Sequence, residues 1–270
     1  MKKKQLKPSG IAAAFSKAKK EGKKVFVPFV TAGDPDINVT LKIVLALERA
    51  GADIIELGVP FSDPMADGPT IQASSERALK KGVTIDTVFS LVRSIRKKTS
   101  IPVVLFGYYN PVFSYGLSRF AERAKKAGAD GVLIVDMPPE ESKELRTELT
   151  KQKLDLIYLL TPTSDISRIK TVTKNATGFI YYVSVAGVTG ARKSVASALA
   201  PAVRRVKKHT KLPVAVGFGI STPAQAREVS KVADGVVVGS AIINVIAKSK
   251  ANVADKKVEG FARSLTRAMR

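Results

Sequence analysis

Three carboxylic acids lie close together in one short segment of the sequence. Glu56 ends an apolar run that is typical of a buried strand, and Asp63 and Asp67 follow within the segment 56–69, which also contains three prolines. Prolines restrict the backbone, so the acidic side chains are presented in few arrangements. Carboxyl groups held in this way are suited to proton transfer and to the stabilisation of positive charge. This segment is therefore the first candidate for chemistry.

The position of Glu56 within its strand predicts where its side chain points. Side chains alternate between the two faces of a strand, so Ile54 and Glu56 share one face while Ile55 and Leu57 share the other. If the second pair faces surrounding helices, Glu56 points inward, where burial raises the pKa of a carboxyl group and lets it act as an acid or base near neutral pH. The alternative is a structural Glu56 that pairs with a lysine or arginine inside the fold.

Two glycine-rich segments near the end of the chain, 216–223 and 238–242, are candidates for binding phosphate. Each follows a predicted strand, and the second leads directly into a helical run. Glycines let a phosphate approach backbone N–H groups, and a helix N-terminus adds positive charge. The segment 187–194 contributes two more glycines and a basic end, which favours a mobile lid over an anionic substrate.

Aromatic residues follow several of the predicted strands and could form a pocket for a flat ring. They are Phe29, Tyr108, Tyr109, Tyr181 and Phe218. Each of them could equally belong to the hydrophobic core, because aromatic side chains are common in barrel interiors.

Short apolar runs alternate with amphipathic helical segments along the whole chain. We expect eight strands, namely Val25–Val30, Ile54–Leu57, Val103–Phe106, Gly131–Val135, Leu156–Leu160, Phe179–Val183, Val214–Val216 and Gly235–Val238. Predicted helices include Val39–Ala50, Asp86–Lys98, Arg119–Ala127, Glu140–Lys151 and Pro223–Val232. This alternation indicates parallel βαβ units, and eight of them favour a (β/α)8 TIM barrel of class α/β over an open doubly wound sheet.

Two further helices are expected at the ends of the chain. Lys7–Lys20, with Ser9 as a candidate cap, is an extra N-terminal helix that we expect to close the barrel floor, and Ala254–Arg270 is the closing helix. Residues 1–270 are therefore expected to form one domain.

The composition excludes several kinds of site. The chain has no cysteine and a single histidine, His209, so disulfides, thiolate catalysis and multi-histidine metal sites are excluded. No apolar run approaches the ~20 residues that span a bilayer, and the basic N-terminus lacks an apolar signal core, so we expect a cytoplasmic protein. The 45 basic and 23 acidic residues give a net charge of +22. The lysine pairs are scattered and not interleaved with aromatics, which favours a solvated basic surface over specific nucleic-acid binding.

Several of these segments together resemble the tryptophan synthase alpha subunit family. The matching segments, which are spread in order over nearly the whole chain, are Pro28–Pro35, Glu56–Pro69, Gly107–Pro111, Asp136–Glu141, Tyr181–Gly190 and Gly217–Ser221. The resemblance implies a single TIM barrel that cleaves indole-3-glycerol phosphate to indole and glyceraldehyde 3-phosphate. It also implies that indole passes to a beta subunit in an alpha2beta2 complex, with pyridoxal phosphate in the beta subunit and no cofactor or metal in this chain.

The resemblance assigns roles to individual residues. Glu56 matches the catalytic glutamate, Asp67 the catalytic aspartate and Tyr181 the active-site tyrosine, while Asp63 and Pro64 match positions that face the beta subunit. The positions that match substrate-binding residues are Phe29, Tyr108, Leu133, Thr189, Gly190, Phe218, Gly219, Gly239 and Ser240. Thr189 matches a lid residue that contacts the aspartate. The departures, Val185 in place of an arginine of some members and Met137 in place of a common leucine, touch none of the expected chemistry.

Two other functions are compatible with the same sequence pattern. A different phosphate-binding barrel enzyme would have no special need for the pair Glu56 and Asp67. A non-catalytic activator of a beta subunit would have no need to keep Glu56, Asp67 and Thr189. Release of indole from indole-3-glycerol phosphate distinguishes both from the lyase.

Overall fold

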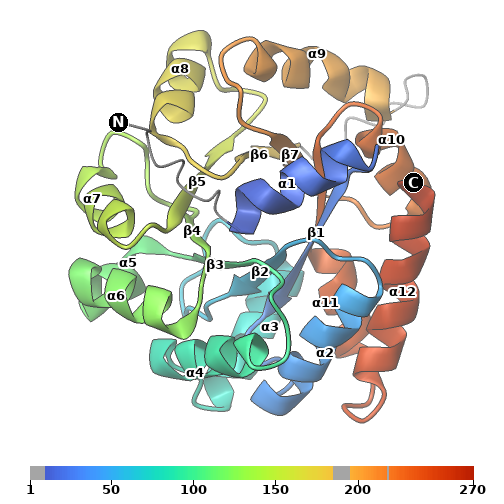
Figure 1. Ribbon diagram of the computed structural model, residues 1–270. Coiled ribbons are helices and arrows are strands. Elements are labelled where there is room, and N and C mark those ends of the chain that lie inside the picture. Colours follow the sequence, from blue (N-terminus) through green and yellow to red (C-terminus); the bar gives the residue numbers. More distant parts are fainter. Residues whose placement is uncertain (1–9, 185–194, 218) are drawn as a thin grey trace, which may run out of the picture.

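The computed structural model describes residues 10–184, 195–217 and 219–270, and in them eight parallel strands close into a barrel (Figure 1). Each strand pairs with the next in the chain, and β8 pairs with β1 to complete the closure. The strands are β1 (Val25–Thr31), β2 (Ile55–Gly58), β3 (Val103–Gly107), β4 (Gly131–Ile134), β5 (Asp155–Leu160), β6 (Ile180–Val183), β7 (Val214–Gly217) and β8 (Gly235–Val238). The predicted TIM barrel is confirmed, and the open sheet is excluded because β1 and β8 are paired.

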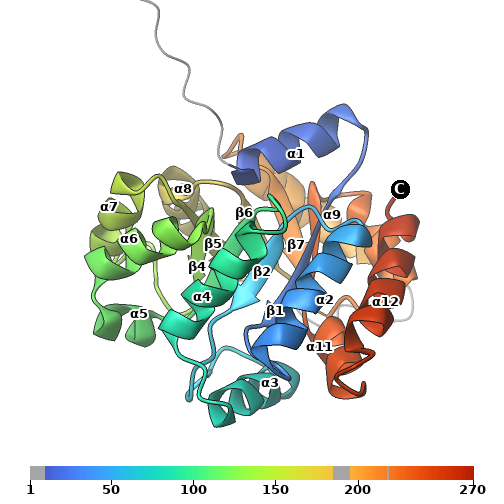
Figure 2. The same ribbon diagram turned by 60° about the horizontal axis from the view of Figure 1, so that its bottom comes forward.

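Helices surround the barrel in a ring, apart from α1, which crosses one end of it (Figures 1 and 2). The first six are α1 (Gly10–Lys20), α2 (Ile37–Arg49), α3 (Pro69–Lys80), α4 (Ile85–Arg96), α5 (Tyr109–Tyr115) and α6 (Leu117–Ala127). The others are α7 (Lys143–Lys151), α8 (Ile166–Asn175), α9 (Val195–Lys207), α10 (Pro223–Ser230), α11 (Ser240–Ala247) and α12 (Ala254–Ala268). Among the residues described, no helix combines the length and the apolar character needed to cross a membrane.

The alternation of side chains along β2 divides the core into two parts. Ile55 and Leu57 pack in the layer between the barrel and its helices, whereas Ile54 packs inside the barrel with residues such as Val104 and Val237. Glu56 lies on the same face as Ile54 and is therefore directed inward. This is the arrangement that the sequence predicted for the strand that carries the first acid.

Helix α1 closes the end of the barrel opposite to α3 and α11 (Figure 2). Ile11, Phe15 and Ala18 are buried on one face of α1 and belong to the interior cluster, where the rings of Phe15 and Phe179 lie 5.6 Å apart. The expected N-terminal helix and its position at the barrel floor are confirmed from Gly10 onward. The candidate cap Ser9 lies outside the described residues.

Several boundaries and helices differ from the sequence prediction. Helix α2 begins two residues earlier than predicted because the Asp36 carboxylate accepts a hydrogen bond from Val39 N and caps it. Helix α7 begins at Lys143 rather than Glu140, after a turn in which Ser142 Oγ donates to Pro139 O. Helix α3, which starts at Pro69 directly after the acidic segment, was not predicted.

Candidate active site

A cavity of about 370 Å³ opens at the carboxyl ends of the strands. Helix α1 lies across the other end of the barrel (Figure 2). Its walls come from most of the barrel strands, from the loop before α3 and from the start of α11. The lining residues are Phe29, Glu56, Ala66, Asp67, Gly68, Ile71, Phe106, Val135, Leu159, Tyr181, Val183, Gly219, Ile220, Ser221, Val237, Gly239, Ser240, Ala241 and Asn244. In TIM barrels this end of the strands is where active sites are built.

Glu56 lies on the inner wall of this cavity and is almost completely buried, with 1% of its surface exposed. Within the described part of the chain, no hydrogen-bond partner reaches its Oε1 atom and no ion pair involves it. Burial alone raises the pKa of Glu56 to about 8. In the described structure Glu56 is therefore not a structural glutamate paired with a basic residue. Its raised pKa keeps the carboxyl group protonated near neutral pH.

Asp67 reaches the same cavity from the loop between β2 and α3. Its Oδ2 atom accepts a hydrogen bond of 3.0 Å from the hydroxyl of Tyr108, and that hydroxyl accepts one of 3.0 Å from Ala66 N. Burial raises the pKa of Asp67, and the bond from Tyr108 partly opposes this change. Two acids in one cavity thus have different surroundings, one apolar and one hydrogen-bonded, as is needed for different roles.

Tyr181 on β6 lines the same cavity as the two acids. Its side chain passes over Gly217 so closely that a Cβ atom there would lie 2.3 Å from the hydroxyl oxygen, so glycine is required at that position. Burial raises the pKa of Tyr181 far above its usual value, and the negative charges of Glu56 and Asp67 raise it further. The tyrosine hydroxyl is therefore a neutral hydrogen-bonding group near both acids.

A glycine loop and the start of a helix line another part of the cavity. Gly219 has a φ of 76°, a left-handed conformation that favours glycine, and Gly239 precedes Ser240 at the first turn of α11. Among the described residues no side chain caps α11. The start of this helix and the loop after β7, at Gly219, Ile220 and Ser221, both line the cavity. A helix start and a glycine loop that converge in this way favour an anionic group such as phosphate.

Comparison with known proteins identifies the family of the chain. The family model of the tryptophan synthase alpha chain matches residues 15–270. The chain belongs to the tryptophan synthase alpha chain family. It is 54% identical to the tryptophan synthase alpha chain of Geotalea uraniireducens (strain Rf4) over 257 residues, which are 95% of this chain and 96% of that protein. With the alpha chain of Citrifermentans bemidjiense it shares 56% identity over the same fractions.

Solved structures agree with this assignment. The crystal structure of the tryptophan synthase alpha subunit of Legionella pneumophila str. Paris superposes with a TM-score of 0.90 at 40% identity, covering 97% of this chain and 99% of that one. A chain of tryptophan synthase from M. tuberculosis, in its aminoacrylate-bound form, gives a TM-score of 0.88 at 30% identity over 97% of this chain and 100% of that one. The reaction of the family is the cleavage of indole-3-glycerol phosphate, so the chain is a carbon–carbon lyase of tryptophan biosynthesis.

Most of the residues expected from the family pattern surround the cavity. Phe29 lines it and packs edge-on against Phe106 with ring centroids 5.1 Å apart. Tyr108 lies behind Asp67 and lines a small neighbouring hollow with it. Leu133 is fully buried in the barrel interior and is not among the cavity-lining residues. The expected residues Thr189, Gly190 and Phe218, and the departure Val185, lie outside the described residues.

Asp63 and Pro64, the expected partner-facing residues, lie at the outer tip of the same loop. Asp63 is exposed and accepts a hydrogen bond of 2.5 Å from its neighbour Ser62, and the adjacent Met65 is 90% exposed. The loop therefore has an inner end at Asp67, in the cavity, and an outer tip that faces solvent.

Several cavity residues escaped the sequence prediction although a signal for them existed. Val135, Leu159 and Val183 each lie two residues beyond an inward-facing residue of their strand, so alternation could have found them. Asn244 lies one turn after Ser240 on α11 and faces the same cavity. In the part of the chain that the structure describes, no three or more acidic or histidine side chains come together in an arrangement that could hold a metal ion.

Proposed function

We propose that Glu56 performs both proton transfers in the cleavage of indole-3-glycerol phosphate. The protonated carboxyl group donates its proton to the ring carbon that bears the side chain, and the resulting carboxylate accepts the proton of the adjacent side-chain hydroxyl. The carbon–carbon bond then breaks, its electron pair returns to the ring and neutralises the cationic intermediate, and the hydroxyl carbon becomes the aldehyde. The observation that supports this role is the burial of Glu56, whose Oε1 atom has no hydrogen-bond partner among the described residues, because this burial keeps the group protonated at neutral pH.

Asp67 is proposed to stabilise the positive charge that forms on the indole ring. Its carboxylate is oriented by Tyr108 and lies in the same cavity as Glu56. A charge held in place before the reaction acts without reorganisation, and such terms are large in a cavity with little water. Tyr181 is proposed to position substrate between the two acids, and the apolar wall that includes Phe29 is proposed to hold the indole ring.

The phosphate of the substrate is proposed to bind at Gly219, Gly239 and Ser240, with Gly190 as a further donor. The approach of the loop after β7 to the start of α11 supports this end of the pose. Leu133 and Phe218 are proposed as further pocket positions, and Thr189 as the residue that contacts Asp67 from the loop 187–194.

The family implies a tryptophan synthase beta subunit as partner. We propose an alpha2beta2 complex in the cytoplasm in which pyridoxal phosphate belongs to the beta subunit, and in which Asp63 and Pro64 contact that subunit. The exposed loop tip at Met65 supports this contact surface. We also propose that residues 1–270 form a single TIM-barrel domain.

The deciding experiment measures indole released from indole-3-glycerol phosphate by the purified protein with a beta subunit. Glu56→Gln should lower turnover by ~10²–10⁴ while leaving the affinity for the beta subunit unchanged. Retained turnover in this variant removes Glu56 from the mechanism. Activation of the beta subunit without any indole release by the wild type would instead identify a non-catalytic activator.

A further inference from the structure

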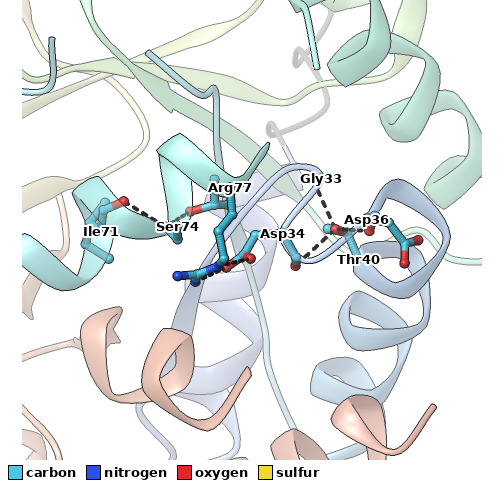
Figure 3. A network of polar contacts seen from close by, with 8 residues as sticks. Gly33, Asp34, Asp36, Thr40, Ile71, Ser74 and Arg77 are labelled. Atoms are coloured by element: carbon cyan, nitrogen blue, oxygen red, sulfur yellow. Dashed lines mark hydrogen bonds and ion pairs between the residues drawn. The ribbon is translucent and has the colours of Figure 1, made fainter. Parts of the chain in front are cut away.

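A partly buried ion pair joins α3 to the loop at the end of β1, outside the cavity. Asp34 lies in the loop after β1 and is 1% exposed, and Arg77 of α3 donates to it twice, from Nε to Oδ1 and from Nη2 to Oδ2, each at 2.8 Å (Figure 3). Such two-point contact fixes the direction as well as the distance between the groups. Neither side chain is among the described residues that line the cavity.

A second contact lies one helical turn away on the same face of α3. The hydroxyls of Thr31 and Ser74 are 2.6 Å apart, and Ser74 Oγ also donates to Ile71 O at 2.8 Å. Because Ser74 and Arg77 are three residues apart, they project from one side of the helix. Helix α3 is therefore attached to β1 at two points, which resist both sliding and rotation.

The loop that carries Asp34 is itself held in place. Thr40 Oγ1 accepts from Gly33 N at 3.1 Å and donates to Asp36 O at 2.8 Å, and Asp36 caps α2 (Figure 3). The ion pair thus connects α3 to a rigid turn at the end of a barrel strand, and not to a free loop.

Other side chains of α3 hold the two ends of the loop between β2 and α3, which carries Asp63 and Asp67. Ser75 Oγ accepts from Phe61 N at 2.8 Å and donates to Phe61 O at 3.0 Å. Gln72 Nε2 donates to Asp67 O at 2.8 Å. The position of α3 therefore determines the position of the beginning of this loop and of the backbone of Asp67.

We infer that Arg77 and Asp34 are positioning residues for Asp67, acting through α3. This inference rests on the proposed role of Asp67. Loss of the pair leaves α3 attached to β1 through Ser74 and Thr31 alone, so α3 can shift and the loop that it holds moves with it. A displacement of about 1 Å in a catalytic group lowers rates by up to ~10²-fold, so we expect Arg77→Gln to lower kcat by ~10- to 100-fold with a smaller change in KM.

A double-mutant cycle tests the inference in the complex with the beta subunit. Turnover is measured for the wild type, Arg77→Gln, Asp67→Asn and the double variant, with thermal unfolding of each. If Arg77 acts only by positioning Asp67, the double variant turns over like Asp67→Asn alone. If the fold-loss of turnover in the double variant equals the product of the two single losses, the inference is overturned. Such independence is expected when Arg77→Gln causes a general loss of structure and does not act through Asp67.

The chain offers a matched control at the other end of the barrel. Arg96 of α4 donates to Asp130 Oδ2 at 2.5 Å and to Gly128 O at 2.7 Å, where β4 begins. Arg96→Gln also removes a partly buried pair, so it should lower the melting temperature while kcat stays within about twofold. A loss of kcat in Arg96→Gln equal to that in Arg77→Gln would overturn the inference.

Two further outcomes separate this inference from the role of Asp67. If Asp67→Asn alone keeps full turnover, the proposed role of Asp67 fails and the inference falls with it. If Asp67→Asn loses turnover but Arg77→Gln does not, only the inference fails. Should Arg77→Gln not fold, Arg77→Lys, which keeps the charge but loses the two-point contact to Asp34, enters the same cycle in its place. Independent effects of Arg77→Lys and Asp67→Asn in that cycle overturn the inference.

Discussion

Replacement of Glu56 by glutamine should change how the stability of the protein depends on pH. In the folded chain, burial raises the pKa of Glu56 from 4.5 to about 8. In the unfolded chain the same carboxyl group is exposed to water and keeps its ordinary pKa. Between these two values the folded state holds a proton that the unfolded state has already released.

The sign of the effect follows from this difference in bound protons. Stability falls with rising pH wherever the folded state binds more protons than the unfolded state. The contribution of Glu56 is therefore most favourable below the unfolded pKa of 4.5, declines as the pH rises, and reaches its full penalty above about 8. The slope is about 1.4 kcal/mol per pH unit, which amounts to roughly 4 kcal/mol between about pH 5 and pH 8.

Urea unfolding of the wild type and of Glu56→Gln at several pH values between about 5 and 9 measures this term. Glutamine has nearly the same shape and carries no charge, so all other titrating groups cancel in the difference between the two proteins. The variant should gain stability relative to the wild type by roughly 4 kcal/mol across the range. A difference that is independent of pH would refute the argument that burial keeps Glu56 protonated.

Two further predictions follow from the geometry of the cavity, and a third follows from the net charge of the chain. Gly217→Ala places a Cβ atom 2.3 Å from the Tyr181 hydroxyl and 2.9 Å from Val237, so unfolding experiments should show a loss of about 1–3 kcal/mol together with reduced turnover; unchanged values for both would contradict the close approach. Ser240→Asp puts a negative charge at the start of α11, and steady-state kinetics should show a KM for the phosphorylated substrate raised roughly a hundredfold or more, whereas an unchanged KM would move the phosphate elsewhere. Because of its net charge of +22, the protein should bind duplex DNA at low salt and lose this binding at physiological ionic strength, as measured by fluorescence anisotropy. A complex that persists at physiological ionic strength would instead support a nucleic-acid-binding function.

The sequence predicted the barrel well because its signals are local and repeated. Buried parallel strands are almost continuous in apolar residues, and every predicted strand overlaps an observed one. The inward direction of Glu56 followed from alternation along a single strand, with Ile55 and Leu57 on the outer face. The closed barrel was predicted from the number of βαβ units, because eight parallel strands favour closure over an open sheet.

The parts that could not be predicted depend on contacts between distant segments. Nothing near Asp67 in the sequence indicates that the hydroxyl of Tyr108, 41 positions away, orients its carboxylate. The pair of Asp34 and Arg77 spans 43 positions and joins a loop to a helix, and the two segments show no shared sequence pattern. Helix α3 itself was missed because its sequence is polar and its buried face consists of Ser74, Ser75 and Ala78 rather than large apolar residues.

The two acids of the cavity are held by different kinds of structure, and this difference suits their proposed tasks. Glu56 lies on a barrel strand whose neighbours on both sides are paired, so its carboxyl group has a fixed position in apolar surroundings. A group that exchanges a proton twice needs that fixed position and an elevated pKa. Asp67 lies at the inner end of a loop whose outer tip, at Asp63 and Met65, is exposed. A contact at that tip shifts Asp67 only if the contacts to Tyr108 and α3 yield, so the strength of those contacts determines how strongly a partner at the tip can influence the charge in the cavity.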